Sequence, residues 1–307
     1  MIKSEIANRQ NLTNLSEFYA QIPEYGSKNI LSNKTHLLWK HLENPYGKSY
    51  LFFEIIDNQI ISAIILQSRP STFRNKSKCF LACDMAILPE YRKLSRFTNL
   101  WKEAKAFCNK EFGTDYMIYH SSNNMSEPLY SSLPLSKKVT ILKPYMFFPG
   151  INLKYVFRRK NSLNEFKDTK EEQFYNWRFN ENSQVEYFTL YGYDRCDDAG
   201  AKIFYRNQKF YVFNCLIILN GATSSCAKCD LRIQRQILQA MFKHRSIVAI
   251  MYAQQNLGKE SMTFFRYWHN IPNKFSPYTF PIYSSNSAPN DYSSEFDPFF
   301  LEDLDVL

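Results

Sequence analysis

Apolar runs separated by polar turns predict a sheet in the first half of the chain. Residues 50–56 and 61–69 are two such runs, and they flank the polar stretch Asp57–Gln59, which is the pattern of a β-hairpin. A third run, Cys79–Leu88, ends at a proline, and Tyr116–His120 is a fourth. Each of these runs has the length and composition of a strand.

Helical periodicity lies between the third and fourth runs. From about Ser95, apolar residues recur three and four positions apart, and Gly113 follows where a helix would end. The residues of this stripe are Phe97, Leu100, Trp101, Ala104, Phe107, Cys108 and Phe112. Shorter helices are expected at Ser16–Ile22 and Asn33–Leu42. The order strand, helix, strand implies parallel strands joined by a crossover, and therefore an α/β fold with a mixed α+β sheet.

The second half of the chain repeats this order imperfectly. Lys202–Leu219 is predicted to form a hairpin around its polar residues, like the hairpin in the first half. A helix at about Asp230–Phe242 and a strand at Ser246–Ala253 follow it. We therefore predict two related domains, residues 1–160 and residues 161–307, with the second contributing to the cleft for the acceptor.

Net charge narrows the class of partner. The chain has 307 residues and a formal net charge of +9, which favours anionic partners such as phosphorylated cofactors, nucleic acid or anionic lipid. No long Lys/Arg tract and no nucleic-acid-binding motif is present, and no apolar run is long enough to span a membrane. We therefore expect neither nucleic acid nor a membrane as partner.

The cysteines indicate a compartment. Seven cysteines, an odd number, argue for free thiols and a cytoplasmic protein. Cys226 and Cys229 have the spacing of zinc and redox sites, but no second pair and no nearby histidine accompanies them. The sequence thus predicts a cytoplasmic protein that uses no metal.

A basic loop stands between the third strand and the long helix. In "EYRKLSRF", the side chains of Arg92, Lys93 and Arg96 lie at or before the start of that helix. The first backbone N–H groups of a helix are unpaired, and with the helix dipole they form an anion site that these bases would reinforce. A plain exposed loop explains the same residues equally well, so this stretch alone leaves both interpretations open.

The loop is part of "AILPEYRKLSRFTNL", which resembles the acyl-CoA signature of the GNAT superfamily of N-acyltransferases. That signature is Arg or Gln, any two residues, Gly, any residue, and Gly or Ala, after a strand that ends in a proline and an aromatic residue. Here its positions are Arg92, Ser95 and Phe97, so both glycines are replaced. The resemblance is strongest over Trp39–Leu135 and weak over the second half.

A second motif of the superfamily follows in the right order, about thirty residues further on. It consists of Asn, a small residue and Tyr, and the matching positions are Asn123, Ser126 and Tyr130. Leu133–Leu135 stands where the superfamily has Leu-Gly-Phe. Two motifs in this order resemble the family more specifically than either one alone.

The resemblance implies how acyl-CoA would be held. Backbone groups of Met85–Ile87 would run beside the pantetheine arm, and one amide would donate to the thioester oxygen. Amides of the Lys93–Thr98 segment would hold the diphosphate. The implied cofactor-binding residues are Met85, Ala86, Ile87, Arg92, Lys93, Leu94, Ser95, Arg96, Phe97, Thr98, Asn123 and Ser126.

The resemblance also assigns a catalytic role to Tyr130, which would protonate the departing thiolate. Asp84 and His120 are candidates for the base that takes the proton of the attacking amine. Asp84 is equally consistent with a structural carboxylate at the end of a strand, and His120 with a core or capping histidine. Holding the amine and the thioester together supplies acceleration even without a base.

The stretch Trp39–Leu66 is similar to a bacterial branch of the superfamily that acts in sugar and cell-surface pathways, where Phe commonly stands at the position of Phe97. This similarity implies transfer of an acetyl or short hydroxyacyl group, such as 3-hydroxybutyryl, from acyl-CoA to a dTDP-linked amino deoxysugar for O-antigen synthesis. Transfer of an aminoacyl group from tRNA to a cell-wall precursor, or a non-catalytic binding role, are the alternatives. The chain is expected to be a monomer or a homodimer.

Overall fold

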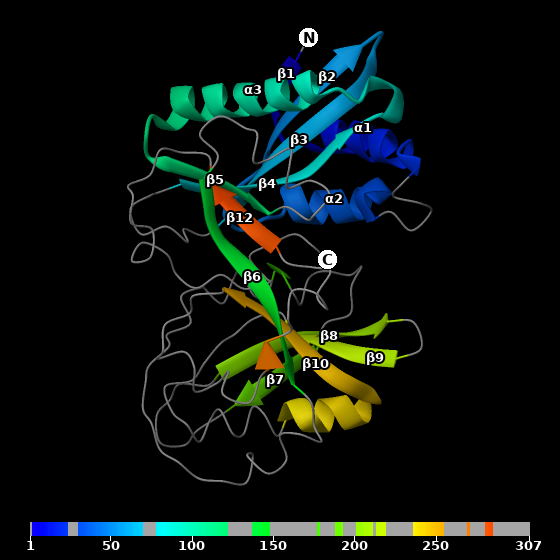
Figure 1. Cartoon of the computed structure of the whole chain (residues 1–307). Coiled ribbons are helices and arrows are strands. Elements are labelled where there is room, and N and C mark those ends of the chain that lie inside the picture. Colours follow the sequence, from blue (N-terminus) through cyan, green and yellow to red (C-terminus); the bar gives the residue numbers. More distant parts are fainter. Residues whose placement is uncertain are drawn as a thin grey trace. The chain divides into compact units, whose positions relative to one another are not determined.

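The computed structural model divides the chain into two compact units (Figure 1). Unit 1 comprises mainly Met1–Ser121, and unit 2 comprises mainly Thr140–Ile282. The residues that the structure describes are 2–23, 30–69, 78–121, 137–147, 177–178, 188–192, 201–210, 213–218, 236–254, 269–270 and 280–284. The border predicted after residue 160 lies outside them.

Unit 1 is built on a sheet with the strand order β1–β2–β3–β4–β5. The strands are β1 Ile2–Ile6, β2 Tyr50–Ile56, β3 Gln59–Arg69, β4 Lys78–Ile87 and β5 Tyr116–Ser121. Neighbours are antiparallel from β1 to β4, whereas β4 and β5 are parallel. The predicted mixed sheet with a parallel crossover is therefore confirmed.

The hairpin between β2 and β3 turns through Asp57 and Asn58. Their φ angles are 48° and 62°, in the left-handed region that Asn and Asp tolerate better than most residues. Two consecutive residues with positive φ make a turn whose twist matches that of the flanking strands. This hairpin was predicted from the polar stretch between two apolar runs, and it is confirmed.

Helices cover both faces of the sheet of unit 1 (Figure 1). Helix α3 (Leu94–Phe112) lies on one face, and α1 (Arg9–Ala20) and α2 (Lys34–His41) lie on the other. Short 3₁₀ turns occur at η2 (Ile30–Ser32) and η3 (Pro89–Tyr91). Among the helices that the structure describes, none combines the length and the apolar character needed to cross a bilayer.

Each face of this sheet has its own hydrophobic core. The core under α3 includes Phe52, Ile64, Phe80, Phe97, Leu100, Trp101 and Ile118. The core under α1 and α2 includes Leu12, Leu15, Phe18, Leu37, Leu51, Phe53 and Ile65. The stripe predicted for α3 faces its core, and Gly113 ends the helix with φ 60° and ψ −118°, a conformation that favours glycine.

The first two elements of unit 1 differ from the prediction. Helix α1 begins seven residues before Ser16, because the Asn8 side chain accepts hydrogen bonds from the backbone N–H groups of Gln10 and Asn11 and so caps the helix. Strand β1 was not predicted, since five residues with mixed polarity carry little strand signal. It forms because its backbone pairs with the edge of β2, with Ile2 opposite Glu54 and Ile6 opposite Tyr50.

Unit 2 has the strand order β6–β10–β9–β8–β7, with β11 paired to β6. The strands are β6 Lys137–Phe147, β7 Phe188–Gly192, β8 Ala201–Phe210, β9 Phe213–Ile218, β10 Ser246–Gln254 and β11 His269–Asn270. A last strand of the chain is β12, Phe280–Ser284. Strands β7, β8 and β9 are antiparallel, while β9 and β10 are parallel and are separated in sequence by a helix at residues 236–243.

The predicted hairpin of unit 2 is confirmed, but its turn is not where polarity placed it. Phe210 lies opposite Phe213, so β8 stays paired with β9 as far as Phe210. The polar residues 206–209 lie inside β8, because a strand with one solvated face carries polar side chains without ending. In strand order β8–β9 corresponds to β3–β4, since each pair is followed by a helix and then by a parallel strand.

Candidate functional site

More than half of β4 lies beyond the ladder that the structure describes between β4 and β5, and we call this segment the open edge of β4. The ladder between β4 and β5 extends from Lys78 opposite Tyr116 to Leu81 opposite Tyr119. Strand β4 continues to Ile87, so residues 82–87 have no partner on β5 in the described ladder. A strand edge that extends beyond its ladder can bind an extended ligand as another strand would.

A β-bulge lies in the middle of this open segment. Ala63 pairs with Ala86 and Ile65 pairs with Cys83, so Asp84 and Met85 on β4 stand opposite one residue of β3. A bulge bends its strand and changes the direction of the backbone groups that follow. Asp84 has φ 50°, a left-handed value in which most side chains are strained.

The start of α3 follows β4 after η3. Lys93 is the N-cap residue, and its side chain forms no capping hydrogen bond. Within the first turn, the Arg96 backbone N–H donates to the Lys93 carbonyl at 3.0 Å. Arg92, Lys93, Leu94 and Ser95 are exposed, whereas Phe97 is buried in the core, as predicted. The arrangement is an exposed helix N-terminus without a side-chain cap, which suits an anion.

The three bases of this loop are not equally available. The Arg92 Nε donates to the Ile87 carbonyl at 3.2 Å. The Arg96 guanidinium lies 2.5 Å from Glu54 Oε1, and its carbon lies 5.5 Å from the centre of the Tyr91 ring. Lys93 has no such contact among the residues that the structure describes, so it is the base that an anion would meet first.

Asp84 lies in a buried polar cluster on the α1 and α2 side of the bulge. The Lys40 Nζ lies 2.6 Å from Asp84 Oδ1, and the His41 Nε2 lies 2.8 Å from Asp84 Oδ2. The Tyr19 hydroxyl donates to the backbone carbonyl of Asp84. The Asp84 side chain is only 6% exposed. As a candidate base it therefore has both carboxylate oxygens engaged within the chain.

His120 lies in the core under α3. It is 0% exposed, and its ring packs edge-on against Trp101 with the ring centres 5.1 Å apart. Burial lowers the pKa of His120 to about 3. A neutral imidazole with so low a pKa is a weak proton acceptor, so this environment favours the structural alternative.

The second family motif lies outside the described residues. Asn123, Ser126 and Tyr130, expected to contact pantetheine and to protonate the thiolate, therefore stay predictions. The same holds for Cys226 and Cys229. The Thr98 side chain, in contrast, is described, and its hydroxyl donates to the Ser95 carbonyl at 3.0 Å.

Sequence patterns missed the partners of Asp84. Lys40 and His41 lie three and four positions after Leu37 in α2, and all three residues are buried. These are the core-facing positions of a helix. Charged residues at such positions are the signal that could have indicated a buried polar cluster.

The same cluster contains a set of atoms that could in principle hold a metal ion. One ligand atom each from His41, Cys83 and Asp84 lies within 4.8 Å of the others. The Asp84 carboxylate is already paired with the Lys40 ammonium, which would repel a cation. The donor set therefore fits a structural ion-pair network better than a metal centre.

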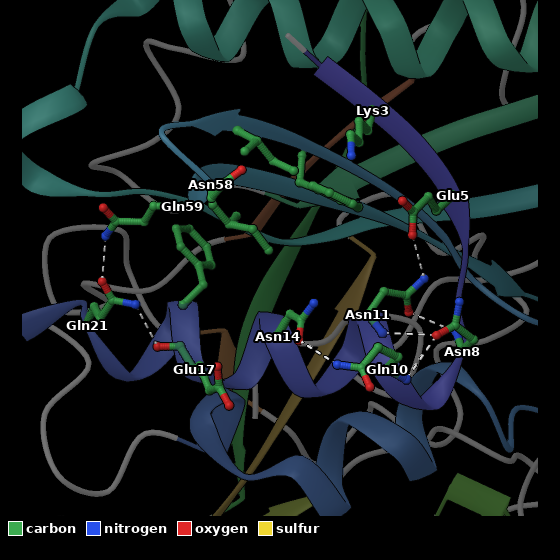
Figure 2. Close-up of a pocket in the computed structure, with 14 residues that line it drawn as sticks. Lys3, Glu5, Asn8, Gln10, Asn11, Asn14, Glu17, Gln21, Asn58 and Gln59 are labelled. Carbon is green, nitrogen blue, oxygen red and sulfur yellow. Dashed lines mark hydrogen bonds between the residues drawn. The ribbon is translucent and has the colours of Figure 1, made fainter.

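A polar hollow of about 580 Å³ opens in unit 1 between α1 and the strands β1–β3 (Figure 2). Carboxamides form most of its polar lining: Asn8, Gln10, Asn11, Asn14, Gln21, Asn58 and Gln59. Several bond to one another, since Gln10 Nε2 donates to Asn14 Oδ1 at 3.0 Å and Gln59 Nε2 donates to Gln21 Oε1 at 2.8 Å. The hollow includes none of the residues around β4 and α3, so we place the candidate site at the open edge of β4.

Comparison with known proteins identifies the fold. No protein-family model and no curated protein matches the chain. Among solved structures, a GCN5-related N-acetyltransferase from Anabaena variabilis matches with a TM-score of 0.61 and 10% identity, over 92% of this chain and 72% of that one. The fold is a GNAT fold.

Two further structures with the GNAT fold or a similar one match over most of their length. A tandem GNAT protein from the clavulanic acid biosynthesis pathway matches with a TM-score of 0.52 and 8% identity, over 95% of this chain and 100% of that one. Saccharomyces cerevisiae N-myristoyltransferase with bound myristoyl-CoA matches with a TM-score of 0.53 and 9% identity, over 93% and 79%. At such identities the likeness concerns the fold, and it confirms the GNAT-like α/β architecture expected from the sequence.

Proposed function

We propose that the protein is an acyl-CoA-dependent N-acyltransferase. The observation that carries this proposal is the open, bulged edge of β4, which is followed after η3 by a helix N-terminus without a side-chain cap. An extended pantetheine arm needs backbone partners, and a diphosphate needs N–H donors with positive charge nearby. Unit 1 provides both within one continuous segment of chain.

The residues present fit acyl-CoA as co-substrate. Backbone groups of Met85–Ile87 would hold the pantetheine arm, and one amide at the bulge would donate to the thioester oxygen. One well-placed donor of this kind contributes about 3 kcal/mol to transition-state stabilisation. Amides of Leu94 and Ser95, with the Lys93 side chain, would hold the diphosphate.

The reaction would be direct attack of an amine on the thioester. The nitrogen lone pair forms the new C–N bond, the C–S bond breaks, and the amine proton passes to solvent or to the thiolate. Tyr130 is the proposed donor to that thiolate. In this proposal Asp84 and His120 are not needed as bases, because positioning supplies most of the acceleration.

For the acceptor we propose the amino group of a nucleotide-linked amino deoxysugar, dTDP-linked, in the synthesis of a surface glycan. The support is the sequence similarity over Trp39–Leu66 and the net charge of +9, which suits two polyanionic substrates. The acyl group would be acetyl or a short hydroxyacyl group. The protein would act in the cytoplasm as a monomer or a homodimer, without a metal.

Titration calorimetry with CoA tests the proposed activity first. We expect binding together with slower hydrogen exchange of amides in β4 and unchanged exchange in β9, because the described residues of β9 from Asn214 to Ile218 are paired with β10. Absence of CoA binding would overturn the acyltransferase proposal and favour a binding protein that has lost its cofactor.

A thiol-release assay then tests the acceptor. Acetyl-CoA and 3-hydroxybutyryl-CoA are offered with dTDP-linked and UDP-linked amino sugars, and we expect release with a dTDP-linked sugar. CoA binding without release on any amino sugar would reject the proposed acceptor while leaving the CoA site intact. Transfer from aminoacyl-tRNA in place of acyl-CoA would support the tRNA-dependent alternative.

A further inference from the structure

A buried ion-pair network holds the β4 bulge from the side opposite to α3. We infer that Lys40 and His41 act through Asp84 as positioning residues, and that they set the direction of the backbone amide that follows the bulge. This inference rests on the proposed function, because it assigns a purpose to the geometry of the acyl-CoA site. It also gives Asp84 a role other than that of a base.

The first argument is the conformation of Asp84. Its φ of 50° lies in the left-handed region, and it occurs at the one place where β4 has two residues opposite one of β3. A residue keeps a sparsely populated backbone conformation where several contacts with the surrounding structure hold it there. Such residues cluster at functional sites. The left-handed turn at Asp84 needs such support.

Contacts from two helices supply that support. Lys40 and His41, both from α2, each contact a different oxygen of the Asp84 carboxylate, at 2.6 and 2.8 Å. Tyr19, from α1, donates to the Asp84 backbone carbonyl. The side chain and the peptide that follows Asp84 are thus fixed independently.

The partners of Asp84 are themselves held in place. The His41 Nδ1 lies 2.9 Å from Ser49 Oγ, which fixes the plane of the ring. The Gln67 Nε2 donates to the Lys40 carbonyl at 3.0 Å and ties the end of α2 to β3. Lys40 is 2% exposed and His41 is 0% exposed. A charge is costly to bury, and its presence beside the bulge indicates a constraint that apolar packing would not impose.

The open edge makes the direction of this peptide consequential. The described ladder with β5 ends at Leu81, so the bulge at Asp84 lies beyond it. A donor must be aimed at the thioester oxygen within a fraction of an ångström to act on it. The network on the other face of β4 is the only support of Asp84 among the contacts described that reaches its carboxylate.

The test uses acetyl-CoA labelled with ¹³C at its carbonyl carbon, bound to the full-length protein. A hydrogen bond to the thioester oxygen moves the carbonyl ¹³C resonance and lowers the C=O stretching frequency relative to free acetyl-CoA. We expect this displacement in the wild type and its loss in Lys40→Met and Asp84→Asn. We expect the affinity for acetyl-CoA to stay within about threefold in both variants, because the diphosphate cradle lies elsewhere.

Steady-state kinetics of the same variants are a second test of the inference. With the acceptor amine on which the wild type is active, or with water as acceptor, kcat should fall about 100-fold while KM for acetyl-CoA changes little, as expected for a reacting atom misplaced by about 1 Å. The double variant Lys40→Met/Asp84→Asn leaves no unpaired charge. It should recover part of the carbonyl displacement, which a lost base would not do.

Controls keep the result interpretable. Lys110→Met makes the same substitution at an exposed lysine of α3 and should change neither signal nor kcat. If Lys40→Met fails to fold, Tyr19→Phe removes only the hydroxyl that bonds the Asp84 carbonyl, and it should reduce the carbonyl displacement. An unchanged displacement in every variant that folds would overturn the inference. Failure of the wild type to bind acetyl-CoA would instead overturn the proposed function and, with it, this inference.

Discussion

Strands β4 and β9 occupy the same place in the strand order of their units, yet their edges differ. Each residue of β9 from Asn214 to Ile218 has a partner on β10, and the ladder of β9 with β8 has no bulge. Strand β4 pairs with β5 only as far as Leu81, and its ladder with β3 is interrupted at Asp84. Among the described residues, the same strand order therefore gives β9 a partner from Asn214 to Ile218, whereas the ladder of β4 ends at Leu81.

The difference shows that the strand order alone does not make a ligand site. The ladder of β10 with β9 also has an irregularity, between Ser246 and Val248, but the bulge of β4 lies at Asp84, beyond the described ladder with β5, where Lys40 and His41 contact its carboxylate. An extended ligand can pair with β4 but meets an occupied edge at β9. The comparison predicts that CoA binds to unit 1 and leaves β9 unaffected.

The largest effect is expected from Ser95→Glu. Ser95 is exposed in the first turn of α3, so a carboxylate there meets the diphosphate directly. Like-charge contact costs several kcal/mol, so CoA affinity should fall about 100-fold or more. Stability should be unchanged or slightly higher, because a negative charge near a helix N-terminus is favourable. Calorimetry with CoA and thermal unfolding measure the two effects.

A variant in unit 2 with the same change in charge is the control for Ser95→Glu. Gln239→Glu adds one negative charge to an exposed position of the helix at residues 236–243. CoA affinity should not change, because that helix follows a strand with a closed edge. Equal losses in the two variants would mean that net charge, rather than the α3 start, governs binding.

A smaller loss of CoA affinity is expected when single basic residues of the α3 loop are replaced, and its size should differ between Lys93 and Arg96. Lys93→Ala should weaken CoA binding about tenfold, since a hydrogen bond to a charged group contributes about 1.5 kcal/mol. Arg96→Ala should weaken it less, because the guanidinium is paired with Glu54 and lies beside the Tyr91 ring. Calorimetry at low and high salt measures both. A larger loss for Arg96→Ala would show that this ion pair opens when the ligand binds.

Much of the fold follows from local sequence patterns. The turn at Asp57 and Asn58, the stripe of α3 and the parallel pair β4–β5 depend on residues close in sequence, and all were predicted. Strand β1 and the first turns of α1 were not, because one depends on a partner edge and the other on the Asn8 cap.

The candidate site was proposed from the sequence, but the contacts around it could not be predicted from the sequence. The segment from Met85 to Thr98 was singled out by its motif, and the exposed start of α3 agrees with that. The bulge at Asp84 depends on the register between β3 and β4, and its ion pairs come from α2, more than forty residues away in sequence. The core-facing positions of Lys40 and His41 indicate a buried polar cluster, but no local pattern identifies Asp84 as their partner, which is why Asp84 was interpreted as a base or a strand-end carboxylate.

The smallest effect on ligand binding and turnover concerns His120, which tests whether unit 1 is more sensitive to acid than unit 2. Burial lowers the pKa of His120 to about 3, while an unfolded histidine titrates near 6.5. The unfolded state therefore binds the proton first, so the contribution of His120 to stability is complete above about pH 6.5. It is lost toward pH 3, by up to about 1.4 kcal/mol per pH unit.

His120→Gln should remove this dependence. Hydrogen exchange between pH 7 and pH 5 should show falling protection of β5 in the wild type, a weaker fall in the variant, and no difference between the two in β10. Turnover of the variant should stay within about threefold of the wild type if His120 is a core residue, whereas loss of a general base would lower it by about 10²–10⁴-fold. A loss of that size with unchanged acid sensitivity would restore His120 as the base and show that burial does not keep it from the reacting amine.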